Sequence, residues 1–307
     1  MRAGQLGLPM NLGYIGGPAD RLIALADLYR EAGRRAGHAA SLRVGVGLHY
    51  LGTGTEASAA APAATVDAPI LDLASRRSID SFTDDLLRSR AHLNLLIDNA
   101  GTRRPPHRLT TVDGYELQFG VNHLGHFVLT AQLLPLLRAG RADVVTQTSV
   151  VAMRAAVNWT DLQWEKRYRP QAAYGRSKVA AGAFGIELQR RFEVGEWGIS
   201  SDAAHPGAAP AGLLGARPEL GRDTEPGLSR AVRTLFRRGI LFGDIDSGAV
   251  PALLAAVTPG GGQLFGPSGL ARLRGPAAEQ KPFASIGDSA TGRRLWTASE
   301  DLTSVRF

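Results

Sequence analysis

The feature that most constrains the fold of this chain is a regular alternation of short apolar runs with longer amphipathic patterns, which begins at Ala68. Each short run fits one buried strand, and each longer pattern fits a helix that returns the chain to the sheet. The alternation predicts an α/β fold with a doubly wound parallel sheet. The strands are expected in "APILDLA", "LNLLIDNAG", "ADVVTQTS", "GISSDAAHPG" and "GQLFGP".

The longer patterns between these runs predict helices. One connection is different, because residues 208–227 are rich in glycine and proline and lie between a strand and a helix. A segment of this composition predicts a long mobile loop that could cover a ligand. The expected helices lie near residues 76–90, 113–139, 171–193, 227–239, 246–257 and 292–301.

The first 67 residues follow a different rhythm. Residues 18–37 have the spacing of an amphipathic helix, residues 42–50 form a plausible strand, and residues 53–69 form an alanine-rich linker. We therefore expect an atypical N-terminal segment and linker over 1–67, followed by the α/β domain over 68–307.

Composition excludes several classes of protein. The net charge is +7, but the arginines are scattered instead of clustered, so we expect no nucleic-acid partner. The chain has no cysteine, which excludes disulfides and thiolate ligands. Its most apolar stretch is broken by Gln132 and Pro135, so no membrane span is expected. The start of the chain lacks the apolar core of a secretory signal, and we expect a cytoplasmic protein.

Tyr174 and Lys178 form the first candidate catalytic pair. Residues four apart on a helix share a face, so the two side chains can act together. A phenol that exchanges a proton near neutral pH needs a nearby positive charge, which the lysine provides. The pair alone is weak evidence, and its surroundings decide its meaning.

Three neighbouring motifs supply those surroundings. Ser149 ends an apolar strand, where doubly wound sheets place their ligands, and its hydroxyl could polarise a carbonyl. "IDNAG" and "AAHPG" end two other strands with residues that tolerate tight turns. Asn122 lies inside a predicted helix, where its amide has low propensity and needs another reason to be there.

Taken together, "LDLAS", "DNAG", "VNHLGHF", Ser149, "YGRSK" and "HPG" resemble the short-chain dehydrogenase/reductase family over residues 68–307. The bacterial retinol-dehydrogenase-like branch fits best, through "DLQWEKRY", "FGPSGLARLRG" and "RRLWTASEDLT". The resemblance implies a Rossmann-type sheet. It also implies that Tyr174 is the general acid/base, that Lys178 binds the nicotinamide ribose, that Ser149 orients the substrate carbonyl and that Asn122 supports a proton relay.

The same resemblance implies a cofactor, NAD or NADP, and a substrate that is a small apolar alcohol or carbonyl compound. A homo-oligomer would form through the helices at 113–139 and 171–193. The implied cofactor-binding residues are Asp72, Leu73, Asn99, Ala100, Gly101, Tyr174, Lys178, Pro206 and Gly207.

Several of these residues have a purely structural alternative. Asp72 could simply end a strand, and Asn99 and Gly101 could be ordinary turn residues. His123 and His126 fit packing positions better than metal ligands, so no metal site is expected.

The family's glycine-rich TGxxxGxG turn is missing from this chain. The nearest candidate has Gly13, Gly16 and Gly17 at a different spacing, and no convincing buried strand precedes it. Residues 9–52 instead resemble a fragment of the luciferase-like flavin monooxygenases, which would replace the first β-α-β portion of the sheet as in a chimera. The sequence therefore leaves two functions open: an NAD(P)-dependent oxidoreductase, or a cofactor-deficient pseudoenzyme or binding protein.

Overall fold

The computed structural model describes residues 10–14, 44–48, 70–208 and 245–307. Its centre is a five-stranded sheet in the order β3-β4-β5-β6-β7, in which the first four strands run parallel and β7 is antiparallel to β6. This confirms the expected α/β fold with a parallel-dominated sheet. The strands are β3 (Leu95–Asp98), β4 (Asp143–Gln147), β5 (Ser200–Ala204), β6 (Leu264–Pro267) and β7 (Ala277–Gln280).

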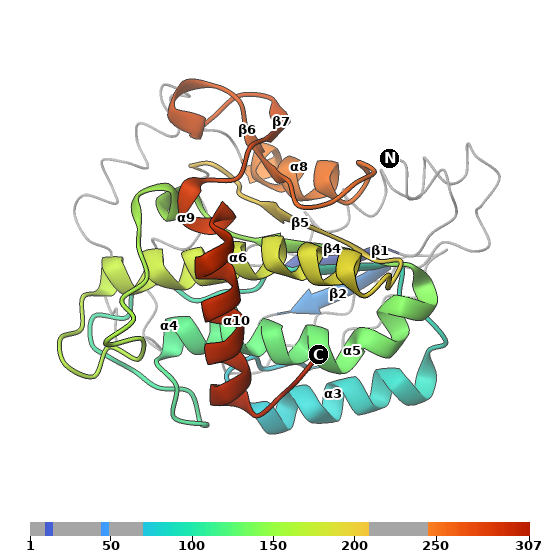
Figure 1. Cartoon of the computed structure of the whole chain (residues 1–307), viewed down its shortest axis with the longest axis horizontal. Helices are drawn as coiled ribbons and strands as arrows, with labels where there is room; N and C mark the ends of the chain where they lie inside the picture. The colour runs from blue at the N-terminus through green and yellow to red at the C-terminus, as the bar shows by residue number, and fades with distance from the viewer. Residues whose placement is uncertain (1–9, 15–43, 49–69, 209–244) are drawn as a thin grey trace.

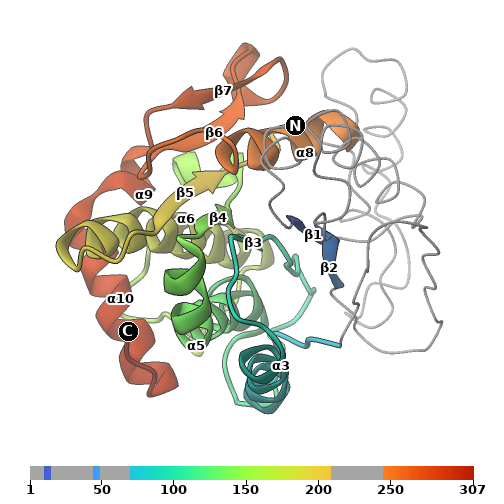
Figure 2. The same cartoon turned by 90° about the vertical axis from the view of Figure 1, so that its right-hand side faces the viewer.

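Helices cover both faces of this sheet (Figures 1 and 2). On one face α6 (Pro170–Val194) packs on β4 and β5, while α5 (Gly125–Gly140) packs on β3 and on α3 (Arg76–Ser89). On the other face α8 (Ile245–Ala255) packs against β5, β6 and β7. Apolar residues dominate β3 and β6, and β4 contains the pair Val144 and Val145, as expected for strands buried on both sides, whereas β5 is buried although it reads Ser-Ser-Asp-Ala-Ala.

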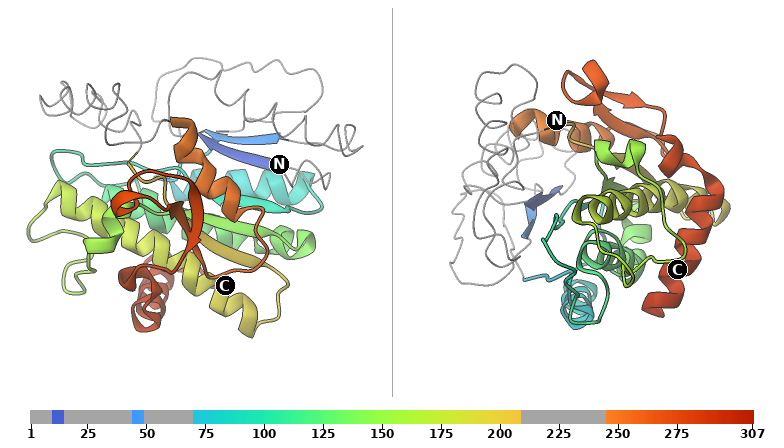
Figure 3. Two further views of the ribbon diagram at one scale, coloured as in Figure 1. Left: turned by 90° about the horizontal axis from the view of Figure 1, so that it is seen from above. Right: turned by 90° about the vertical axis from the view of Figure 1, so that its left-hand side faces the viewer.

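A second pair of strands comes from the N-terminal segment. β1 (Met10–Tyr14) pairs in parallel with β2 (Val44–Leu48), and β1 lies beside β3 (Figures 2 and 3). β2 confirms the strand expected within residues 42–50. β1 contains Gly13 and ends at Tyr14, before Gly16 and Gly17, so it does not form a strand that precedes all three glycines. Gly16, Gly17 and the expected helix over 18–37 lie outside the described residues.

The strand expected over "APILDLA" is not formed in the described residues, where Leu71 makes a single bridge. The chain turns at once, because the Ala74 N–H donates to Asp72 Oδ1 (2.9 Å) and the Asp72 N–H donates to Ser78 Oγ (2.9 Å). Ser75 then caps the first turn of α3.

The helix expected over 113–139 begins later than predicted. Glu116 caps it by accepting the N–H groups of Gln118 and Phe119, and α4 (Leu117–Phe119) leads into a π-helical turn, Gly120–Leu124, and then into α5. π-helical turns are often found at functional sites. Here the turn contains Asn122.

The C-terminal part of the chain crosses the outer side of the helical layer. α9 (Ala284–Gly287) and β7 were not expected, whereas α10 (Ser289–Thr303) confirms the expected last helix. α10 packs across α6 (Figure 1). Its Trp296 contacts the rings of Phe127, Phe184 and Phe307 at centroid distances of 5.2, 5.8 and 4.5 Å. None of the helices in the described residues is long and apolar enough to cross a membrane.

Two further expectations lie outside the described residues. They are the helix near 227–239 and the mobile loop, of which only residue 208 is described.

Candidate active site

Tyr174 and Lys178 lie one turn apart in α6, and both are buried. The Lys178 Nζ donates a hydrogen bond to the carbonyl oxygen of Gln147, the last residue of β4 (2.8 Å). A second link joins the same places, because Thr148 Oγ1 donates to the Lys178 carbonyl oxygen (2.6 Å). Lys178 therefore lies at the C-terminal end of β4, and Tyr174 lies one turn before it on α6.

Asn122 joins this helix to the end of β3. Its Oδ1 accepts the N–H of Thr102 (2.7 Å), and its Nδ2 donates to the Thr102 carbonyl oxygen (3.0 Å) and to Ser177 Oγ (2.9 Å). Ser177 in turn donates to the Tyr174 carbonyl oxygen (2.9 Å). These partners explain why a residue with low helix propensity occupies a buried position in a π-helical turn.

Gly101 lies where these groups converge. A Cβ added to Gly101 would sit 2.8 Å from Asn122 Oδ1 and 3.5 Å from Lys178 Nζ. The first distance is too short for a real side chain, so glycine leaves the backbone open beside the amide and the ammonium. The structure thus brings together three residues that the sequence analysis selected separately.

Ser149 lies two residues beyond β4 and begins a 3₁₀ turn, Val150–Arg154. Its Oγ is 3.5 Å from the Val151 N–H, at the limit of a hydrogen bond. Because it directly follows Thr148, the residue tied to the Lys178 carbonyl, Ser149 belongs to the same strand end as the pair on α6.

Pro206 and Gly207 follow β5, the next strand of the sheet. Gly207 has a φ of +68°, and its N–H donates to His205 Nδ1 (3.2 Å). Burial lowers the pKa of His205 to about 4, so its ring stays neutral and accepts this bond. The next residue, Ala208, donates its N–H to the Leu273 carbonyl oxygen (2.8 Å), which ties the turn to the segment between β6 and β7.

The other four predicted cofactor-binding residues lie beside the ends of two elements, β3 and α3. Asn99 and Ala100 follow β3 directly and lead into Gly101. The carboxylate of Asp72 holds a local turn, and Leu73 is a buried core side chain that packs with α5, so its side chain is not exposed to a ligand.

Burial sets the charge of the ionisable groups around the site. It lowers the pKa of Lys178 to about 8, so the ammonium persists at neutral pH. It raises the pKa of Asp98, the last residue of β3, to about 7, although the hydrogen bond from Thr130 Oγ1 (3.0 Å) opposes this shift.

The two histidines have protein partners. The Nε2 of His123 is 2.7 Å from Ser299 Oγ on α10, and burial lowers its pKa to about 3. The Nδ1 of His126 is 3.3 Å from the Asn122 carbonyl oxygen. Within the described ranges, no group of three or more side chains has the arrangement of a metal site.

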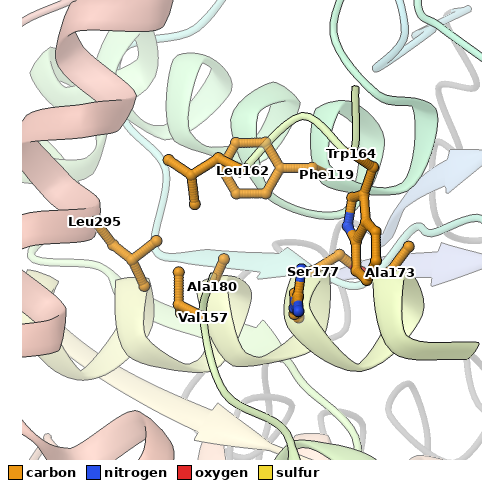
Figure 4. A pocket seen from close by; sticks show the side chains of 9 residues that line it. Phe119, Val157, Leu162, Trp164, Ala173, Ser177, Ala180 and Leu295 are labelled. Atoms are coloured by element: carbon orange, nitrogen blue, oxygen red, sulfur yellow. The ribbon is translucent and has the colours of Figure 1, made fainter. Parts of the chain in front are cut away.

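A small pocket lies beside α6 (Figure 4). Arg176, one of its lining residues, stacks on the Trp164 ring at 3.9 Å from the ring centroid. Ser177 links this pocket to the site, because it also holds the Asn122 amide. The lining is mostly apolar. It consists of Phe119, Val157, Leu162, Trp164, Ala173, Arg176, Ser177, Ala180 and Leu295.

Sequence reasoning missed Thr102, Arg103, Gln147 and Ser177. Ser177 carries the one available signal, a hydroxyl three residues after Tyr174 on a buried face of the helix. The others act through a backbone group or a tertiary contact, for which no residue pattern exists.

An open, parallel-dominated sheet that gathers a tyrosine–lysine pair, an asparagine and a serine at its C-terminal edge defines a Rossmann-type α/β protein with an enzyme-like site. Residues 53–218 match the family model described as short chain dehydrogenase, beginning before the boundary expected at Ala68. The chain belongs to the short chain dehydrogenase family, whose members are oxidoreductases that use a nicotinamide cofactor.

Curated relatives agree with this assignment. Retinol dehydrogenase 13 of Mus musculus is 35% identical over 246 residues, which cover 78% of this chain and 69% of the relative. Polyprenol dehydrogenase of Mus musculus is 36% identical over 238 residues, covering 76% and 67% of the two chains.

Solved structures share the fold. An uncharacterised protein of Mycobacterium paratuberculosis matches with a TM-score of 0.68 and 28% identity over 98% of this chain and 94% of its own. RhlG of Pseudomonas aeruginosa, solved as an NADP active-site complex, matches with a TM-score of 0.52 and 20% identity over 84% and 93% of the chains. None of these matches supports the resemblance of residues 9–52 to flavin monooxygenases.

Proposed function

We propose that this protein interconverts an alcohol and a carbonyl compound with NAD or NADP, and that Tyr174 transfers the proton. The observation that carries the proposal is the bridge made by Asn122. It ties the end of β3 to the helix that bears Tyr174 and Lys178, and Lys178 is tied to the end of β4. This cross-bracing supports the proposal, because it holds Asn122 and Lys178 at the ends of adjacent strands.

The described residues fit a nicotinamide cofactor at this edge of the sheet. Gly101 leaves space that a Cβ would fill, beside a buried ammonium, and two buried polar atoms there, Thr102 Oγ1 and Gln147 Oε1, have no hydrogen-bond partner. Lys178 would hold the nicotinamide ribose, with Gly101 and Gly207 at the edges of the site. A bound nicotinamide supplies or accepts the hydride.

Each of the chain's own residues has a defined task in reduction. The Tyr174 hydroxyl donates its proton to the substrate oxygen, and the Ser149 hydroxyl donates a hydrogen bond to the same oxygen. Lys178 supplies a positive charge one helical turn from Tyr174. Asn122 holds α6 against the segment that follows β3. In alcohol oxidation, Tyr174 takes the proton back.

The substrate is proposed to be an alcohol or the matching carbonyl compound. The names of the relatives, retinol dehydrogenase and polyprenol dehydrogenase, support this class. We retain the cytoplasmic location as a proposal.

The test combines cofactor binding with turnover. We expect the nicotinamide fluorescence of NADH or NADPH to increase when the purified full chain binds it. Tyr174→Phe should keep that binding while its turnover falls at least about a hundredfold. The mutant lacks only the hydroxyl, so a fall in binding is not expected. Normal turnover by Tyr174→Phe would refute the proton-transfer role.

The second candidate, a cofactor-deficient binding protein, is favoured by the missing TGxxxGxG motif. For this candidate, the fluorescence titration should show no binding of NADH or NADPH even at millimolar concentration. That result would exclude the oxidoreductase.

A further inference from the structure

Arg103 stands beside the proposed proton donor. It directly follows Thr102, whose N–H and carbonyl groups are both bound by the Asn122 amide, so the backbone before Arg103 is fixed. From there the guanidinium reaches over the Tyr174 ring, with its central carbon 5.0 Å from the ring centroid. Stacking of this kind holds the planar guanidinium in one orientation.

The positive charge of Arg103 has no protein carboxylate beside it in the described part of the chain. Its Nε is buried without a hydrogen-bond partner. Burial lowers the pKa of Arg103, with Tyr174 acting in the opposite direction, but a guanidinium remains charged in proteins. A partly buried, unpaired charge costs free energy that a bound anion would recover.

The acidic residues that lie nearest to Arg103 along the chain have other partners. Asp113 accepts the Arg76 N–H (2.8 Å). Asp98 accepts a hydrogen bond from Thr130, and Glu116 caps α4 through both carboxylate oxygens. Some arginines elsewhere are paired, as Arg190 and Arg191 are with Glu187. Arg103 therefore differs from Arg190 and Arg191, because no carboxylate of the described residues pairs with its charge beside Tyr174.

We propose that Arg103 binds a carboxylate on the substrate, so that the preferred substrates are alcohols or carbonyl compounds that also carry an acid group. This inference rests on the proposed function, because it assumes that the reacting oxygen lies at Tyr174. It replaces a wholly apolar substrate with one that has an anionic end. The planar N–H fork of arginine matches the two oxygens of a carboxylate, and such charge-assisted pairs are stronger than neutral hydrogen bonds.

Kinetics on matched substrates test the proposal. A graded series of straight-chain ω-oxo acids and the methyl ester of each differ only in the charged group. We expect Arg103→Met to lower kcat/KM for the acids by roughly 10–100-fold and to leave the esters nearly unchanged, since a hydrogen-bonded charge pair is lost only for the acids. Arg103→Lys should restore part of the acid activity.

Arg104→Met is the matched control. It removes the neighbouring arginine, whose Nη1 donates to Gln171 (2.8 Å), and should leave the preference for acids over esters intact. Equal losses on acids and esters in Arg103→Met, or no loss on either, would overturn the proposal.

A binding experiment separates this proposal from the catalytic one. We expect hexanoate, but not neutral hexanamide, to give saturation-transfer NMR signals with the wild type and Arg104→Met and to lose them with Arg103→Met. That result without turnover by any variant would leave the anion site standing and contradict turnover of these substrates. Unchanged hexanoate binding in Arg103→Met would overturn the anion site while Tyr174-dependent turnover still stood.

The remaining source of an anion is the cofactor itself. If Arg103→Met weakens NADPH binding and leaves hexanoate binding unchanged, the guanidinium serves a cofactor phosphate, and the substrate proposal is wrong.

Discussion

At the scale of single residues, burial decides the protonation states that the site can use. Lys178 has a carbonyl oxygen as its hydrogen-bond partner, and burial lowers its pKa to about 8. Asp98 has one hydroxyl donor, and burial raises its pKa to about 7. Both groups therefore change charge close to physiological pH, although their ordinary pKa values lie far from it.

Lys178 should make cofactor binding depend on pH. The ammonium that we propose to hold the ribose loses its proton as the pH rises through about 8. If only the charged form binds, the affinity for NADH or NADPH should fall about tenfold between about pH 7 and pH 9, as measured by nicotinamide fluorescence. Lys178→Arg stays charged over this range, so its affinity should not vary with pH. A wild-type affinity that is constant over this range contradicts the assignment.

Asp98 should make stability fall as the pH rises. The folded state holds its proton more tightly than the unfolded chain, where the pKa is near 3.8, so stability is lost between about pH 4 and pH 7. Asp98→Asn cannot ionise, and we expect it to gain about 2–3 kcal/mol over the wild type in going from pH 5 to pH 8. Urea unfolding at the two pH values measures this. Asp84→Asn, at an exposed position on α3, is the control and should change neither value.

At the scale of elements, the sequence predicts the helices and strands that are encoded by a pattern of neighbouring residues. The strands β3 to β6 and the helices α3, α6 and α10 follow from apolar runs and helical spacing. The π-helical turn does not, because it depends on the partners that Asn122 finds in Thr102 and Ser177. β7 has no apolar alternation in "AAEQ" and exists through its pairing with β6.

The same limit applies to the site. Tyr174, Lys178, Ser149 and Asn122 could be selected because their residue types and strand-end positions have chemical meaning. The position of Arg103 over the Tyr174 ring could not, since it depends on how the segment after β3 packs against α6.

The turn after β5 gives a prediction at this scale. Gly207 has a positive φ, and a Cβ there would lie 2.5 Å from the Leu273 carbonyl oxygen. Gly207→Ala should therefore push the turn away from the β6–β7 segment, with a cost of about 1–3 kcal/mol and weaker cofactor binding. Thermal unfolding and cofactor titration measure the two effects. Gly198→Ala also has a positive φ but meets no atom within 4 Å, so it should lose stability without losing cofactor affinity.

At the scale of the whole molecule, the C-terminus closes the helical layer. α10 lies across α6 (Figure 1). His123 contacts Ser299 on α10, and the rings of Trp296 and Phe307 pack against Phe127 and Phe184. The family resemblance implies an oligomer through the helices at 113–139 and 171–193. In this chain α10 occupies part of their outer surface, so an assembly through that part would require α10 to move.

Trp296 should contribute much of the stability of the packing between α10 and the helical layer. Its side chain is 2% exposed, lies against three aromatic rings and stacks beneath the Arg191 guanidinium at 4.0 Å. Replacing it with alanine removes a large apolar surface and leaves a cavity, so Trp296→Ala should lower the free energy of unfolding by about 3–5 kcal/mol. Trp159→Ala is the control, because that ring is partly exposed, stacks with Arg294 and packs against a different cluster from the one that contains Trp296. Chemical denaturation of both variants measures the difference. If Trp296→Ala costs no more than Trp159→Ala, the C-terminal helix is not an integral part of the core, and the outer faces of α5 and α6 become available to a partner.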